Sequence, residues 1–306
     1  MEEKVNELRN YLPIYFESKE NNEYVEYLTS AYLKNVEAEK YQFSFIAFHI
    51  LYMCFIYKTI WSLKKNGDTA NFNAIMNSCR HKHKLSVYSS LFDISVLGET
   101  DSFNFIRLFP FHQNDIDKFS HPVEVRNHCA HASGKLHYKE KEIEEYVCKE
   151  LEYISQIQQK SEPILKKMFI DFLRENWNPE KRPFSTSETA IDDFIRKNLF
   201  SIKDIEYLIR LDIPELGKKS DNKKIIYMKV LYLVFLSIAQ RFVEYDSNLF
   251  IDNLSLLMHG FKEQKKISIE TLVNDEFSGL VQSRNDEDKK KFEKITKVKL
   301  EKYQYV

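Results

Sequence analysis

Glycine and proline are scarce in this chain, with 6 and 7 among its 306 residues. β-Sandwiches and propellers need many tight turns, and nucleotide-binding loops need closely spaced glycines. The composition therefore argues against those folds and against a glycine-rich phosphate loop. Because 43% of the residues are hydrophobic and 14% are aromatic, the chain can still bury a large core, and we expect an all-α protein.

Cysteine and net charge are also low. The 4 cysteines form no Cys-x-x-Cys pair and no apolar leader precedes them, so we expect reduced thiols in a cytoplasmic protein. Lysine and arginine, 45 together, nearly balance 46 acidic residues and leave a net charge of −1. No global positive field draws nucleic acid to such a chain, so any RNA contact has to come from a local patch.

Two long runs lack most charged residues. Residues 41–57 carry no formal charge, but this run contains His49 and ends at Lys58, short of the roughly 20 apolar residues that span a bilayer. Residues 225–243 are interrupted by Lys229. We therefore expect both runs to be buried helices, and we expect no contact with a membrane.

Apolar residues recur at helical spacing through most of the chain. The pattern predicts helices over residues 5–16, 23–63, 72–97, 122–134, 139–176, 191–200, 202–211, 224–245, 248–261, 269–277 and 287–306. Residues 101–121 contain many aromatics without a clean period, and we expect a connector there. Ser201 and Asp204 have the spacing of a capping box at the start of a helix.

The best linker candidate is residues 178–183, where two prolines flank a charged run. We place a domain boundary there. The prediction is an N-terminal helical bundle over residues 1–177 and a second helical domain over residues 178–306.

The run from Arg126 to His131 brings a permanent cation, an amide and an imidazole into one predicted helix. RNA is cut internally when its 2′-OH attacks the adjacent phosphorus, which requires a proton acceptor, a proton donor for the leaving 5′-oxygen and positive charge on the phosphorane. Histidine, with a free pKa of about 6.5, suits both proton roles, and arginine offers a planar fork to the phosphate oxygens. These are the groups that cleavage of RNA without a metal requires.

Helical spacing refines this arrangement. Asn127 and His131 are four residues apart and share a face, so the amide can orient the imidazole or hold the phosphate. Arg126 and His131 diverge by roughly 140° on an ideal helix. Either the arginine side chain curls round the helix, or two copies of the motif meet across a two-fold axis and share a composite site. The second option makes dimerisation a condition of activity.

Arg126, Asn127 and His131, late in a helical bundle and after a long aromatic helix, resemble the Arg-x(4–6)-His signature of the HEPN superfamily. The asparagine after the arginine is one variant of that signature, and Ala130 and Gly134 fit its common form. The residues just before the histidine are similar to those of abortive-infection members.

The resemblance, which covers residues 20–160, implies a HEPN-like all-α bundle that forms a homodimer along the motif helices. It also implies a metal-independent endoribonuclease that needs no cofactor, cleaves cellular RNA such as tRNA or mRNA, and leaves 2′,3′-cyclic phosphate ends. In that family the residues matching Arg126 and His131 are catalytic, and the one matching Asn127 assists. Such nucleases are toxins or anti-phage defence effectors, so we expect an antitoxin or regulatory partner. The second domain would select the RNA, regulate the nuclease or bind that partner.

A basic run follows Cys79. The residues that we expect to contact RNA outside the active site are Arg80, His81, Lys82, His83, Lys84 and His137. A solvated basic loop and an ordinary surface histidine are the alternatives. The cysteine and the histidines of this run could approach one metal only in an extended chain, and zinc needs a full set of converging ligands, so we expect no metal.

Two hypotheses compete with the nuclease. In one, the same dimeric bundle is a non-catalytic adaptor that binds a protein partner or a nucleotide. In the other, Arg126 and His131 form a surface pair while Cys129 and Ala130 face a core. Cleavage of RNA in EDTA distinguishes the nuclease from both.

Overall fold

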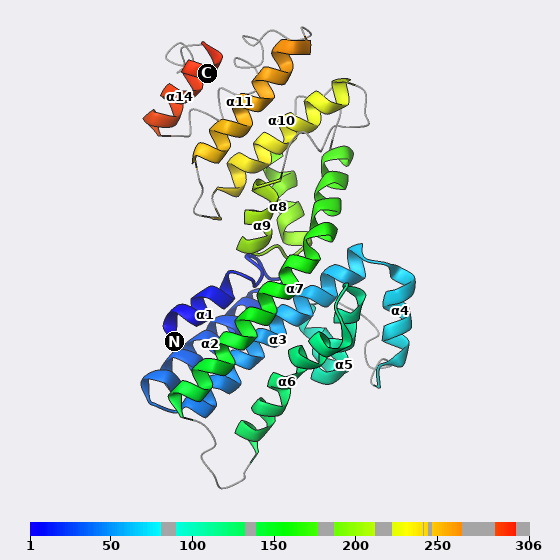
Figure 1. The fold of residues 1–306 in the computed structure, drawn as a ribbon, viewed down its shortest axis with the longest axis vertical. Coiled ribbons are helices and arrows are strands. Elements are labelled where there is room, and N and C mark those ends of the chain that lie inside the picture. The colour runs from blue at the N-terminus through cyan, green and yellow to red at the C-terminus, as the bar shows by residue number, and fades with distance from the viewer. Residues whose placement is uncertain are drawn as a thin grey trace. The chain divides into compact units, whose positions relative to one another are not determined.

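The computed structural model describes residues 1–80, 90–131, 139–176, 187–211, 222–240, 242–243, 247–264 and 285–297 (Figure 1). These residues form helices joined by turns, and no β-strand occurs among them. An isolated bridge pairs Pro13 with Ser201. The all-α class predicted from the sequence is confirmed.

The chain divides into two units. The first comprises Met1–Leu165 and Arg196–Asp204, and the second comprises Lys166–Ile195 and Ile205–Val306. The boundary predicted near residue 178 lies outside the described residues and stays a prediction.

The first unit is a helical bundle. Its helices are α1 (Glu2–Arg9), α2 (Lys19–Glu37), α3 (Tyr41–Asn66), α4 (Thr69–Ser78), η2 (Leu91–Leu97), α5 (Glu99–Phe103), η3 (Asn104–Leu108), α6 (Gln113–Ala130) and the first part of α7 (Glu140–Glu175). Helix α3 is central, since α1, α2, α4, η2, α5 and α6 all pack against it (Figure 1). Side chains of α7 also reach it, and the rings of Phe45 and Tyr146 lie 5.9 Å apart.

Helix α3 forms the core because it is apolar on nearly every side. Phe45, Phe48, Phe55 and Ile56 are at most 1% exposed. The helix is long and apolar enough to cross a membrane, but most of its side chains are buried within the first unit. The prediction of a buried helix is confirmed for this run.

Helix α6 begins well before the proline that we expected at its start. Pro122 lies inside the helix, whereas the sequence predicted a connector over residues 101–121. That prediction is wrong, because α5 and η3 also lie in the expected connector. Proline inside a helix costs about 3 kcal/mol. The cost is offset by packing, since Phe119 before the proline and Val123 after it are both buried.

Several other predicted helices have the wrong bounds, and two of them show why. The helix predicted over residues 5–16 ends at Arg9, because the chain beyond it is held in another conformation by Ile14, whose backbone N–H donates to Phe200 O at 2.9 Å. The helix predicted over residues 23–63 is interrupted between α2 and α3, where Glu39 has a φ of +56°. A left-handed residue ends a helix sharply.

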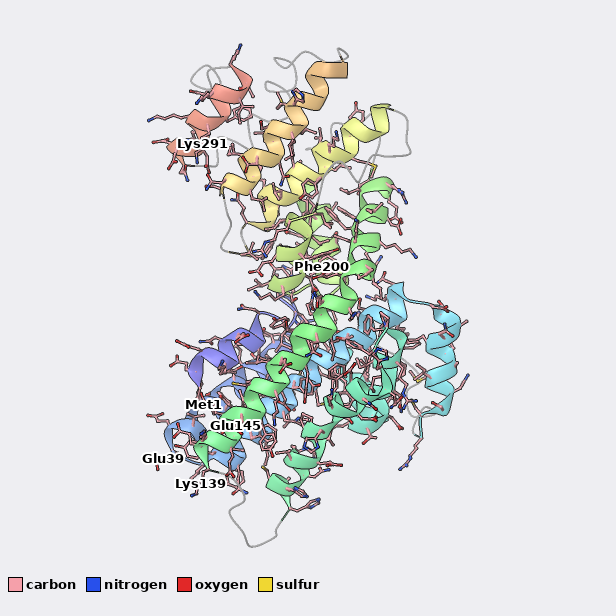
Figure 2. The ribbon with its side chains drawn as sticks, in the orientation of Figure 1. Met1, Glu39, Lys139, Glu145, Phe200 and Lys291 are labelled. Carbon is pink, nitrogen blue, oxygen red and sulfur yellow. The ribbon has the colours of Figure 1, made fainter. Side chains whose placement is uncertain are left out.

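The second unit contains the end of α7, most of α8 (Ser187–Lys197) and α9 (Ile202–Ile209), and α10 (Asn222–Ala239), α11 (Ser247–Gln264) and α14 (Asp286–Thr296). Its core gathers round Phe169, whose ring lies 4.6 Å from that of Phe235. Lys291 of α14, labelled in Figure 2, donates to Asn248 of α11 at 2.8 Å.

Candidate functional site

The predicted catalytic residues lie at the end of α6. Arg126 and Asn127 are within its last five residues, and both are half-buried. His131 is exposed and follows the last helical residue, and its backbone N–H donates to Asn127 O at 3.0 Å. The backbone is extended at His131, with φ −80° and ψ 141°. Because φ at His131 is close to the helical value and its N–H keeps the helical bond to Asn127 O, its side chain still leaves the chain near the face of Asn127. The extended ψ redirects only the chain that follows. The stop predicted at Gly134 lies outside the described residues.

Arg126 is directed towards α5. Its Nη2 forms an ion pair with Oε2 of Glu99, the first residue of that helix, and the two side chains are 25% and 21% exposed. In the described part of the chain, the ion-pair partner of Arg126 is thus a carboxylate and not the histidine of its own motif.

A buried histidine lies behind Glu99. His49 of α3 is fully buried, its Nε2 lies 3.6 Å from Glu99 Oε2, and its Nδ1 lies 2.5 Å from Oε1 of Glu150 on α7. The first distance suits an ion pair but is too long for a hydrogen bond, whereas the second is a short, charge-assisted hydrogen bond. Arg126, Glu99, His49 and Glu150 alternate in charge, and we call these residues the charge row.

The pKa values of the charge row depend on one another. Burial alone lowers the pKa of His49, but the carboxylates of Glu150 and Glu99 outweigh burial and raise that pKa to about 9. Burial raises the pKa of Glu99, but His49 and Arg126 outweigh it and lower that pKa below its ordinary value. Burial raises the pKa of Glu150, and the neighbouring imidazolium opposes the rise. At neutral pH the imidazole of His49 is therefore held as a cation by its two acidic neighbours.

The charge row is not evident from the sequence, because most of its members look ordinary alone. His49 only interrupts an uncharged run, and Glu99 only follows a glycine. A signal was present at Glu150, which falls between Val147 and Ile154 on the apolar stripe of its helix. A carboxylate in that position needs a buried partner that is positively charged or donates a hydrogen bond. The sequence could not say which residue supplies it.

The predicted RNA contacts are described only in part. Arg80 is exposed just after α4, and its backbone N–H donates to Asp101 Oδ2 at 2.9 Å. The residues of this prediction that lie outside the described ranges are His81, Lys82, His83, Lys84 and His137. Within the described ranges, no group of three or more histidine, cysteine, aspartate or glutamate side chains could hold a metal ion.

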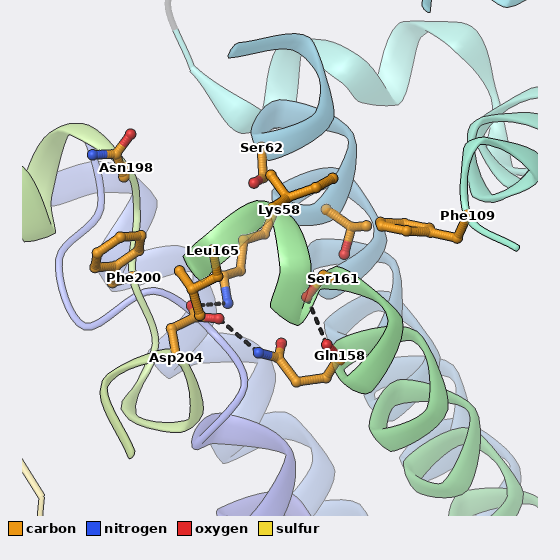
Figure 3. A pocket seen from close by; sticks show the side chains of 11 residues that line it. Lys58, Ser62, Phe109, Gln158, Ser161, Leu165, Asn198, Phe200 and Asp204 are labelled. Atoms are coloured by element: carbon orange, nitrogen blue, oxygen red, sulfur yellow. Dashed lines mark hydrogen bonds and ion pairs between the residues drawn. The ribbon is translucent and has the colours of Figure 1, made fainter. Parts of the chain in front are cut away.

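A second cluster of buried charge surrounds Lys58 of α3 (Figure 3). Its amine donates to Asp204 at 2.5 Å, to Ser201 Oγ at 2.9 Å and to Tyr11 O at 3.2 Å. Gln158 donates to the other oxygen of Asp204 at 2.7 Å. All of these residues belong to the first unit.

The geometry of the Lys58 cluster suits a structural role. Its amine has an acceptor in each of three directions, and the adjoining cavity of about 30 Å³ has room for little more than a water molecule. Burial lowers the pKa of Lys58, and Asp204 partly offsets that effect. Ser201 and Asp204 also form the predicted capping box, since each backbone N–H donates to the other side chain, at 2.7 and 3.2 Å. That prediction is confirmed.

The end of α6, unlike the Lys58 cluster, has polar side chains that a ligand in solvent can reach. An exposed imidazole and a partly exposed guanidinium are available there to a ligand in solvent, and the ion pair with Glu99 leaves other N–H donors of Arg126 open. Such groups suit an anionic substrate whose reaction includes proton transfer. The chain matches no protein-family model, no curated protein and no solved structure.

Proposed function

We propose that this protein is a metal-independent endoribonuclease with a HEPN-like site at the end of α6. The observation that carries the proposal is the position of its motif residues. His131 is exposed where the helix ends, and Arg126, a few residues before His131 in the sequence, is half-buried and forms an ion pair with Glu99. An arginine used only as a solvated surface charge needs no buried charge behind it. A directed guanidinium and an exposed histidine at the end of one helix fit phosphate chemistry.

The reaction needs two proton transfers and one charge stabilisation. The RNA 2′-oxygen attacks the adjacent phosphorus while a base takes its proton, the bond from phosphorus to the 5′-oxygen breaks, and that oxygen receives a proton. The products are a 2′,3′-cyclic phosphate and a 5′-hydroxyl. His131 acts as base or acid, Arg126 stabilises the charge on the phosphorane, and Asn127 helps to hold the phosphate or the imidazole.

A homodimer would complete the site. The described chain directs Arg126 towards Glu99 and leaves His131 in solvent, so a second copy can supply the other proton-transfer group across a two-fold axis. The nuclease would act in the cytoplasm as a toxin or anti-phage effector, with the residues from 178 onward selecting RNA or binding an antitoxin.

The test is cleavage of total cellular RNA by the purified full-length protein in EDTA. We expect cuts with 2′,3′-cyclic phosphate ends, and we expect Arg126→Ala and His131→Ala each to lower the rate at least about 100-fold. Arg107→Ala and His121→Ala are matched controls, because both residues are exposed in the same unit, Arg107 on η3 and His121 on α6. They should cleave at the normal rate.

Other outcomes argue against this function. Equal loss in the control variants would mean that the rate reports general damage to the fold. Absence of cleavage, together with no growth arrest when the protein is expressed in cells, would favour the non-catalytic adaptor.

A further inference from the structure

The structure assigns a second task to the charge row: Glu99 is a positioning residue that sets the direction of the Arg126 guanidinium, and His49 and Glu150 hold Glu99 in place. This inference rests on the proposed nuclease for its consequence in catalysis. The arrangement itself is testable without any catalytic activity.

Arg126 needs such a support because an arginine side chain is long and flexible. An unsupported arginine at a helix end loses rotamer entropy when one conformation is imposed on it. A catalytic group has to stay within about 0.5 Å of its working position. Glu99 restricts the side chain beforehand, because its carboxylate meets one Nη of the guanidinium and leaves the remaining N–H groups available.

Glu99 is itself held from behind. The buried His49 Nε2 lies 3.6 Å from the same carboxylate oxygen that faces Arg126, so that oxygen lies between two cations. The opposite nitrogen of His49 is hydrogen-bonded to Glu150, which is also fully buried. The imidazole is thus fixed by α7 at one side and meets α5 at the other. A movable surface ion pair has no such chain of buried partners.

The backbone also fixes the start of α5. Gly98 precedes Glu99 with a φ of +83° and a ψ of 157°, a conformation that other residues rarely adopt. η2 ends at this glycine and α5 begins directly after it. The glycine therefore determines where the Glu99 side chain leaves the backbone, and the same short segment connects two elements packed on α3.

The first test measures the freedom of Arg126 directly. Phenylglyoxal labels arginine side chains, and mass spectrometry of the digested protein gives a rate for each of them. The exposed Arg107 is the internal reference. We expect Glu99→Gln to raise the labelling rate of Arg126 about fivefold relative to Arg107, and Glu99→Asp, which keeps the charge but shortens the side chain, to give a smaller rise.

Glu124→Gln is the matched control. Glu124 lies on α6 close to Arg126 in sequence, but it is exposed and pairs with His121, so its loss should leave the labelling of Arg126 unchanged. Circular dichroism and the thermal midpoint show whether each variant is folded, and the Asp variant serves if the Gln variant is not. Unchanged labelling of Arg126 in a folded Glu99 variant would overturn the inference.

The second test asks whether positioning matters to cleavage. We expect Glu99→Gln to cleave RNA about 10-fold to 100-fold more slowly, mainly through kcat, with partial recovery in Glu99→Asp. Adding Glu99→Gln to Arg126→Lys should have little further effect if Glu99 acts through the arginine. Faster labelling with an unchanged cleavage rate would refute the role in catalysis. A wild-type protein that cleaves no RNA would instead refute the proposed function, while the labelling result would still decide the arrangement of Arg126.

Discussion

Replacing Lys58 with methionine should destabilise the first unit strongly. Lys58 is buried, and its amine makes an ion pair with Asp204 and donates to Ser201 and Tyr11. Methionine has a similar length and no charge, so it removes the amine and preserves most of the packing of the side chain. The loss then measures how much the buried charge contributes.

The size of the loss in stability depends on the hydrogen bonds that Asp204 keeps after the amine is removed. Removing one partner of a buried ion pair costs about 3–5 kcal/mol, mainly because the other charge stays buried. Asp204 keeps hydrogen bonds from the Ser201 backbone, the Ser201 hydroxyl and Gln158, which places the expected cost near the lower limit, at about 3 kcal/mol. A domain of this size then melts about 6–12 °C lower.

A second substitution checks that interpretation. Asp204→Asn removes the carboxylate charge that Lys58→Met leaves unpaired. The side-chain amide of Gln158 can then rotate so that its oxygen accepts a hydrogen bond from the new asparagine amide. In the Lys58→Met background we therefore expect this change to restore about 1–2 kcal/mol, although the same change alone is destabilising. The coupling energy between the two changes is the restored amount plus the cost of Asp204→Asn alone, so we expect it to be about 3 kcal/mol.

Urea unfolding followed by tryptophan fluorescence gives these free energies. The chain has 2 tryptophans, and replacing Trp177 with phenylalanine leaves Trp61 of α3 to report on the first unit. Arg9→Met is the control, since its ion pair with Glu26 is exposed and worth less than about 1 kcal/mol. The reasoning is refuted if Lys58→Met costs no more than this control, or if Asp204→Asn destabilises both backgrounds equally.

Three further predictions concern the surroundings of the candidate site. The pKa of His49 is raised from 6.5 to about 9, so its contribution of about 3 kcal/mol to the free energy of unfolding is complete below about pH 6.5 and is lost as the pH rises through about 9. Urea unfolding across that range should give a flatter pH dependence in His49→Gln than in the wild type. Gly98→Ala should lower stability by about 1–3 kcal/mol because of its positive φ, and should speed the labelling of Arg126, whereas an unchanged thermal midpoint would contradict the strain. Ser90→Ala should cost about 1 kcal/mol, since Ser90 and Asp93 form a capping box at η2, and Asp93→Ala should show a similar shift of the thermal midpoint.

Local patterns predicted the parts of the fold that depend on neighbouring residues. The uncharged run at 41–57 indicated a buried helix, and α3 is the centre of the first unit. Ser201 and Asp204 had the spacing of a capping box and form one. Both features follow from side chains a few residues apart, which a sequence displays directly.

Tertiary contacts account for what the sequence did not show. Pro122 reads as the start of a helix, yet α6 continues through it because its apolar residues pack on α3. His49 and Glu150 are 101 residues apart, so no spacing rule connects them. A buried pair between distant helices becomes visible only when the packing of those helices is known.

The sequence of the Arg126–His131 motif likewise does not show what its side chains contact. An arginine and a histidine at the end of a helix occur in adaptors and in enzymes, and their spacing is identical in both. A catalytic guanidinium has to be held close to its working position before a ligand arrives. Glu99 meets that requirement in this chain, with His49 and Glu150 behind it. Buried charge alone does not decide between the two classes, because the Lys58 cluster of the same unit buries charge in a structural role. The labelling of Arg126 therefore has to be combined with the RNA-cleavage result.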